Sequence, residues 1–223
     1  MSDISVIVPV LNEANTIQPW LQHLNQFDVE VIVVDGGSTD HTIDQVRPHA
    51  QIVSSAPGRA QQMNTGAALA SRSILLFLHA DTWLPPNADK LIEQALQQAQ
   101  WGRFDVSFKG DRYQRRMRII AWFMNCRSRL TRIATGDQGI FVTKTMFTGI
   151  NGYQLMPLME DVNLCQRLKR QSSCVCLTDK VTTSSRRWEQ HGFFKTVFLM
   201  WKLRLYYWLG MAPEKLHAQY YGH

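Results

Sequence analysis

Hydrophobic positions in the first hundred residues fall into short continuous runs, separated by polar turns and by segments with helical spacing. Runs at 4–11, 29–34 and 74–81, with a shorter one at 51–54, predict strands. Their Val- and Ile-rich character favours strands buried on both faces, as in a parallel sheet. Helices are expected through Ile17, Leu21 and Leu24 and at 42–46, 59–71 and 87–100. This alternation is typical of a doubly wound α/β sheet.

The pattern of the second half is less regular. Short strands are expected at 104–108, 140–142, 175–177 and 181–184, with a loop at 149–157. Helices are expected at 113–130, 160–169 and 192–209. We find no internal repeat and no low-complexity tract, so the chain is read as one domain with a C-terminal segment.

Polar side chains follow three of the predicted strands at the point where each strand ends. Asn12 and Glu13 follow the first strand, Asp35 follows the second, and His79 and Asp81 close the run at 74–81. Ligands of open α/β sheets bind just outside the carboxyl ends of the strands. A helix cap or a turn explains one such carboxylate, but three in succession predict an acidic pocket for a metal ion and the sugar hydroxyls of a nucleotide.

The composition, net charge and cysteine content exclude some classes of protein and favour others. The 223 residues are 45% hydrophobic and 19% charged, which excludes a disordered chain. The net charge of +6 favours anionic ligands. Four cysteines without metal-ligand spacing, and an N-terminus without a basic leader, predict reduced thiols and a cytoplasmic protein, with a peripheral position at the inner face of the membrane as the alternative.

Four collinear motifs resemble the family 2 glycosyltransferases of GT-A fold. They are Pro9-Val10-Leu11-Asn12-Glu13, Val34-Asp35-Gly36-Gly37-Ser38-Thr39-Asp40, His79-Ala80-Asp81, and Glu160-Asp161 after a Gly-Tyr loop. A finer resemblance, through Ala56-Pro57-Gly58-Arg59, Pro157-Leu158-Met159-Glu160-Asp161 and Ser185-Arg186-Arg187-Trp188, is to the radical-SAM/selenodomain-associated transferases. The resemblance implies a mostly parallel mixed sheet flanked by helices. It also implies a GT-A domain at 1–190, with a nucleotide-sugar half at 1–100, an acceptor half at 101–190, and a C-terminal helical segment at 191–223.

The resemblance further implies how a nucleotide-diphosphate sugar would be held. Glu13 and Asp35 would contact ribose and base, with Asn12 beside them and Pro9 shaping the strand end. In place of the family's Asp-x-Asp metal motif stands His79-Ala80-Asp81, so Asp81 is expected to bind Mn²⁺ or Mg²⁺, and His79 to bind metal or ribose.

Two further groups complete the expected chemistry of an inverting transfer. The pair Glu160-Asp161 matches the family's base motif, with Asp161 as the general base and Glu160 binding the acceptor or tuning Asp161. The alternative for this pair is that it begins a helix and complements the helix dipole. Phosphate or base contacts are expected from the remaining residues, which are Arg59, Arg186, Arg187 and Trp188.

Two other functions fit parts of this pattern. A nucleotidyltransferase builds a similar sheet, but its first loop should be rich in Gly and basic residues, whereas this loop is Asn12-Glu13-Ala14-Asn15. A nucleotide-sugar-binding protein with impaired catalysis is the other alternative, since His79 stands where the family's metal motif has its first Asp. The acceptor, whether small molecule or lipid-linked, is not indicated.

The sequence does not determine what two helices of the second half contact. The aromatic helix at 192–211 carries Lys195, Lys202 and Arg204, and each charge costs about 2.5–3.5 kcal/mol near a bilayer centre, which argues against a membrane span. We expect it to pack under the sheet, to form a homo-oligomer interface, or to lie on a membrane surface.

The arginine-rich helix at 113–132 is expected to show a solvated basic face, and an acceptor lid or a membrane patch are the alternatives. Nucleic-acid binding by this helix is disfavoured.

Overall fold

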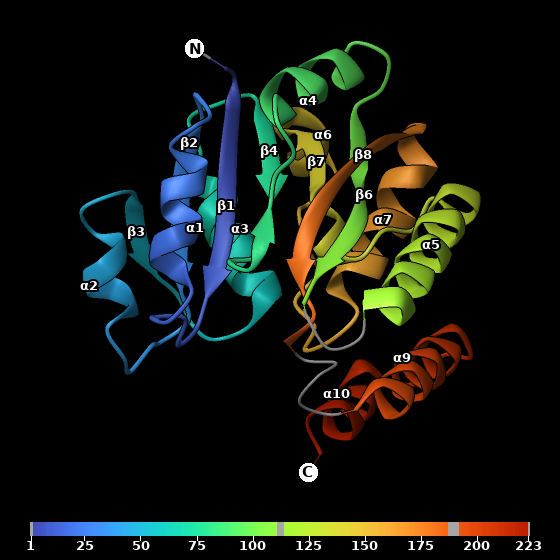
Figure 1. The fold of residues 1–223 in the computed structure, drawn as a ribbon. Helices are drawn as coiled ribbons and strands as arrows, with labels where there is room; N and C mark the ends of the chain where they lie inside the picture. Colours follow the sequence, from blue (N-terminus) through green and yellow to red (C-terminus); the bar gives the residue numbers. More distant parts are fainter. Residues whose placement is uncertain (1, 111–113, 187–191, 223) are drawn as a thin grey trace.

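A single mixed sheet runs through the protein in the strand order β3-β2-β1-β4-β7-β6-β8-β5 (Figure 1). The computed structural model describes residues 2–110, 114–186 and 192–222. Parallel pairs join β1 (Ile4–Val10), β2 (Glu30–Asp35), β3 (Gln51–Ser54) and β4 (Ile74–Phe77). Antiparallel β7 (Ile140–Thr143) then leads to β6 (Trp101–Lys109), β8 (Cys174–Ser184) and the short β5 (Thr82–Trp83). The predicted mostly parallel mixed sheet flanked by helices is confirmed.

Helices cover both faces of the sheet, because the strands are apolar on both sides. Val6 and Val8 of β1 belong to a core with α1 (Ile17–Leu24) and α4 (Ala88–Leu96). Ile7, on the opposite face, belongs to a second core with α3 (Arg59–Leu69), α6 (Lys144–Gly149) and α7 (Glu160–Gln171). The short α2 (Thr42–Val46) adds Val46 to the first core.

Helix α3 lies close against the strands that carry the predicted donor residues. A Cβ atom at Gly66 would stand 2.5 Å from Cγ2 of Ile7, so this approach requires glycine. One turn earlier, the buried Gln62 amide donates hydrogen bonds to the carbonyls of Val10, at 2.9 Å, and Val34, at 2.8 Å. Gln62 therefore holds together the carboxyl ends of β1 and β2.

Helix α5 (Gln114–Thr131) is fixed to β6 by a buried charged network rather than by apolar packing alone. Asp105 pairs with Arg103, which is 1% exposed, and accepts a hydrogen bond from Arg129 at 2.6 Å. The Asn125 side chain bonds to the backbone N–H and carbonyl of Val106. The expectation of a solvated basic face holds only for the first turns of α5, where Arg115 is exposed.

The C-terminal segment forms a helical pair, α9 (Phe193–Trp208) and α10 (Pro213–Tyr221), beyond the carboxyl ends of β6 and β8 (Figure 1). Leu203 and Leu216 of this pair pack on Leu158, Met159 and Val162 around the start of α7. The expectation that this helix packs under the sheet is therefore wrong, and α10 was not predicted. Among the described helices, none is both long enough and apolar enough to cross a bilayer.

Several predicted boundaries differ from the structure for local reasons. The run at 74–81 leaves the sheet after Phe77, because a hydrogen bond from Thr82 N–H to the His79 carbonyl, at 3.0 Å, closes a turn. The two short strands expected at 175–177 and 181–184 are one strand, since β6 pairs along both with a bulge between Arg103 and Asp105. The helix α6 lies in a segment for which no helix was predicted.

Candidate active site

A cavity of about 740 Å³ opens at the carboxyl ends of β1 and β4. Its wall includes η1 (Gly136–Gln138), the start of α7, the end of β8, and α5, α9 and α10. Most of the residues predicted for the site line this cavity: Pro9, Glu13, Arg59, His79, Asp81, Glu160, Asp161 and Arg186. Asn12 and Asp35 do not line it, and Arg187 and Trp188 lie outside the described residues. Segments from both halves of the chain therefore meet in one site.

Asn12 and Asp35 organise the two loops beside the cavity. Asp35 is 1% exposed and accepts hydrogen bonds from the backbone of Gly37, at 2.9 Å, and of Ser38. Asn12, in the left-handed region at φ 56°, accepts a hydrogen bond from Thr39 N–H at 2.8 Å. These contacts join the loop after β1 to the loop after β2 and thereby position Glu13.

Glu13 and Arg186 form the pair at the edge of the cavity nearest β1. The Glu13 carboxylate accepts a hydrogen bond from Thr16 Oγ1 at 2.7 Å and lies 3.5 Å from Nη2 of Arg186. Both side chains are partly exposed, so the pair contributes little to stability. The guanidinium, which is 48% exposed, remains accessible to an anionic ligand.

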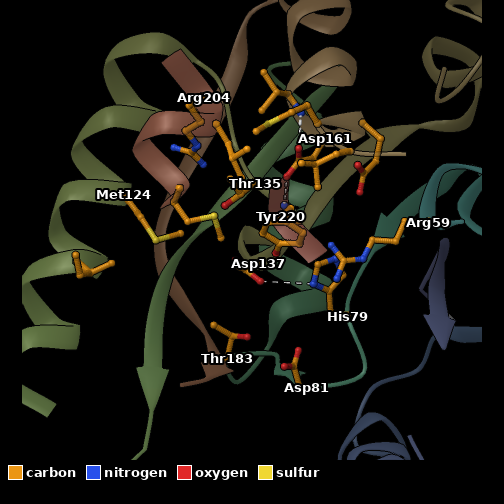
Figure 2. A pocket seen from close by; sticks show the side chains of 18 of the residues that line it. Arg59, His79, Asp81, Met124, Thr135, Asp137, Asp161, Thr183, Arg204 and Tyr220 are labelled. Atoms are coloured by element: carbon orange, nitrogen blue, oxygen red, sulfur yellow. Dashed lines mark hydrogen bonds and ion pairs between the residues drawn. The ribbon is translucent and has the colours of Figure 1, made fainter. Parts of the chain in front are cut away.

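His79 is held between Asp137 and the backbone of η1. Its Nδ1 lies 3.5 Å from Oδ1 of Asp137, the contact drawn as a dashed line in Figure 2. Burial opposes the charge on Asp137, but its hydrogen bond with His79 holds the pKa of this carboxyl below the usual value. On the other side of the ring, a Cβ atom at Gly136 would stand 2.5 Å from Nε2 of His79. Glycine at this position therefore gives the imidazole its room.

Asp81 is the acid that best fits a cation. Burial raises the pKa of the Asp81 carboxyl; His79 opposes the rise, while the Asp137 and Glu13 carboxylates add to it. A divalent cation would relieve this crowding of negative charge. Within the described part of the chain, no group of three or more His, Cys, Asp or Glu side chains could hold a metal ion.

The acid pair at the start of α7, Glu160 and Asp161, lines the cavity together with Arg59 and His79. Asp161 accepts hydrogen bonds from Gly136 N–H at 2.8 Å and from Val162 N–H at 2.7 Å. Glu160 is 6% exposed, and burial raises its pKa, with the adjacent Asp161 adding to the rise. Asp161 thus lies in the first turn of α7, with its carboxylate fixed by two backbone amides.

The sequence over residues 5–152 matches the family model described as glycosyl transferase family 2. The chain belongs to glycosyl transferase family 2. Among curated proteins, none matches the sequence.

Solved structures show the same fold at low identity to this family 2 glycosyltransferase. TarS of S. aureus (residues 1–349) in complex with UDP-GlcNAc is 18% identical, with a TM-score of 0.64. The alignment covers 83% of this chain but only 59% of that one, so the chain spans about three fifths of its relative. Glucosyl-3-phosphoglycerate synthase from Mycobacterium tuberculosis in complex with UDP is 19% identical, with a TM-score of 0.56 over 80% of this chain and 70% of that one.

Two arginines of this family 2 glycosyltransferase enter the site without having been predicted for it. Arg127 of α5 and Arg204 of α9 line the cavity, although a solvated basic face was expected for α5 and no role in the site was predicted for the charges of α9. The signal for these arginines lies in tertiary packing, since periodicity alone does not distinguish an inward-facing arginine from a solvated one.

Proposed function

We propose that this family 2 glycosyltransferase moves a sugar from a nucleotide-diphosphate sugar to a hydroxyl acceptor with inversion. The observation that carries the proposal is the shared cavity. Glu13, Asp81 and Asp161, from the loop after β1, the end of β4 and the start of α7, all line it. An inverting transfer needs a base on the face of the sugar opposite the leaving group. The separation of Asp161 from Asp81 in Figure 2, with His79 and Asp137 between them, supports that geometry.

The donor is proposed to lie at the end of the cavity formed by β1, β4 and α3. Glu13 and Asp35 are assigned to ribose and base, with Asp35 acting through the loop that it organises. Arg59, at the first turn of α3, and Arg186 are assigned to the diphosphate. TarS was solved with UDP-GlcNAc, and this supports a uridine nucleotide as the first donor to test.

A divalent cation would be held by Asp81, with His79 and Asp137 at its side. When bound, Mg²⁺ or Mn²⁺ supplies charge neutralisation of the diphosphate leaving group. Because the Nδ1 atom of His79 faces Asp137, we assign His79 to orienting the site as well as to cation or ribose contact.

Asp161 is proposed to take the proton of the attacking hydroxyl. Its two backbone hydrogen bonds fix the position of the carboxylate, while leaving further lone pairs for the acceptor. Glu160, with its raised pKa, suits a hydrogen-bonding contact with the acceptor. General-base catalysis of this kind is worth about 10²–10⁴ in rate.

Three further proposals concern the domain bounds, the subfamily and the exposed surface of α9. We assign residues 1–190 to the GT-A domain, residues 191–223 to an appended helical segment, and the chain to the radical-SAM/selenodomain-associated subfamily. The exposed face of α9 supports contact with a membrane surface, since it presents a stripe of large apolar side chains: Phe198, Trp201, Leu205 and Trp208. A second copy of the chain is the competing occupant, and light scattering of the purified protein distinguishes the two.

The donor proposal is tested by thermal unfolding of the wild-type protein and of Asp81→Asn with UDP. We expect UDP to raise the unfolding temperature, and Mn²⁺ or Mg²⁺ to increase that rise in the wild type. Asp81→Asn should keep the UDP effect and lose the effect of the cation, because the amide is a poorer cation ligand than a carboxylate. If UDP with cation leaves the wild-type unfolding temperature unchanged, the proposed function is wrong.

A further inference from the structure

Two arginines face the cavity away from the donor end. Arg127 comes from α5 and Arg204 from α9, and both line the cavity. Figure 2 shows Arg204 beside Thr135 and α5, on the opposite side of the pocket from Asp81 and Arg59. Arg186, in contrast, pairs with Glu13, and its charge opposes the rise in the pKa of Asp81. The cationic side chains thus form two separate groups.

The guanidinium of Arg127 lacks the partners that a buried cation requires. Its Nε and Nη2 atoms are buried and have no hydrogen-bond partner among the described residues. Burial, with the neighbouring charge of Arg204 acting in the same direction, lowers the pKa of Arg127 to about 10. Burial likewise lowers the pKa of Arg204, with Asp161 and Asp137 opposing the change. The nearby Asp161 and Asp137 carboxylates leave Nε and Nη2 of Arg127 without a hydrogen bond, so the pair of arginines favours a further anion that can accept from them.

We propose that Arg127 and Arg204 form an anion subsite for a phosphate group carried by the acceptor. This inference rests on the proposed function, because Asp161 lies near both guanidinium groups and would meet the acceptor hydroxyl. A phosphate monoester carries close to two negative charges and accepts forked hydrogen bonds from guanidinium groups. It therefore balances both arginines, whereas a carboxylate balances one.

The wall around this subsite is apolar and comes from the same two helices. Ile120 and Met124 belong to α5, and Met200 belongs to α9. A low-polarity wall strengthens the attraction between guanidinium and phosphate. The phosphate itself has two sources, a soluble phosphorylated compound or the headgroup of a polyprenyl lipid.

Calorimetric titration of inorganic phosphate into the wild-type protein, with and without saturating UDP and Mg²⁺, tests the subsite. We expect phosphate to bind in both conditions, because the subsite is separate from the donor end. Arg127→Gln and Arg204→Gln should each weaken binding by at least about tenfold, the effect expected for loss of one charged hydrogen-bonding partner. Arg118→Gln, on the exposed face of the same helix α5, is the matched control and should bind as the wild type.

Three results would overturn the subsite: no phosphate binding, displacement of phosphate by UDP, or equal binding by the three variants. Displacement by UDP would assign both arginines to the donor diphosphate. Failure of the proposed function is separate, since it appears as absent UDP binding in the same titrations. Arg127→Lys keeps the charge but not the fork, so partial recovery with this variant excludes misfolding as the cause.

Two binding experiments distinguish the soluble source of the phosphate from the lipid-linked one. Displacement of inorganic phosphate by glucose 6-phosphate assigns the subsite to a soluble acceptor. Binding of the wild type, but not of Arg127→Gln, to phosphatidylcholine vesicles carrying a polyprenyl monophosphate assigns it to a lipid-linked one. Either result supports the subsite.

Discussion

Substitution of Asp161 by Asn separates the chemical role of this carboxylate from its structural role. Asp161 accepts one hydrogen bond at each oxygen, from Gly136 N–H and from Val162 N–H. Asn has a single carbonyl oxygen, so its NH₂ group must face one of these amides. Leaving a donor unsatisfied costs about 1–3 kcal/mol, and loss of the charge at the start of α7 adds about 0.3–1 kcal/mol. The free energy of unfolding should therefore fall by about 1–4 kcal/mol.

The activity of Asp161→Asn should fall further than this stability loss explains. Removal of a general base lowers kcat by about 10²–10⁴, whereas a protein that retains a few kcal/mol of stability stays folded. Urea unfolding measures the first effect, and UDP release from a UDP-sugar under saturating conditions measures the second. Asp179→Asn, at an exposed position of β8, is the matched control and should change neither. Wild-type kcat in Asp161→Asn would refute the assignment of the base.

The remaining predictions concern the buried ion pair of Asp105 in β6 and the thiol of Cys176 in β8. Asp105→Ala leaves the guanidinium of Arg103 buried without its carboxylate, so we expect a loss of about 3–5 kcal/mol in urea unfolding, and a loss below about 1 kcal/mol would contradict the network. The hydrogen bond from Cys174 lowers the pKa of Cys176 to about 5, so its iodoacetamide reaction should be nearly independent of pH above neutrality. A rate that rises with pH up to the range of an ordinary thiol would show that Cys176 is not a thiolate.

Local patterns predicted much of the sheet, because its strands are buried on both faces and interrupted by polar turns. The ends of β1 and β2 were predicted well, since Asn12 and Asp35 bond to nearby backbone. The end of β4 was not, because the apolar Leu78 continues the pattern past the turn that begins at His79. Similarly, β8 was divided in two, since the polar stretch around Asp179 hides a strand that pairing with β6 sustains.

The predicted site residues came from strand ends and helix starts, where a position in sequence determines a position in space. Asp81 and Asp161 reach the same cavity for that reason. Arg127 and Arg204 could not be predicted, because their inward direction depends on how α5 and α9 pack on other elements. The exposed stripe of α9 has the same origin: Leu203 takes the buried position, and Trp201 and Trp208 are left outside. Hydropathy alone would have assigned the tryptophans to the core.

The continuous sheet affects how this enzyme must open and close. β4 and β7 are hydrogen-bonded neighbours, so the proposed donor and acceptor ends of the cavity are joined by one continuous sheet. Hinge rotation between them would break ladder hydrogen bonds. The wall that does not belong to the sheet or its flanking helices comes from α9 and α10, held by a small apolar cluster around Leu203 and Leu216. Substrate exchange is therefore expected to follow the detachment of this pair, and turnover to be limited by it. An enzyme without the pair would admit bulk water to the sugar–phosphate bond, and hydrolysis would then compete with transfer.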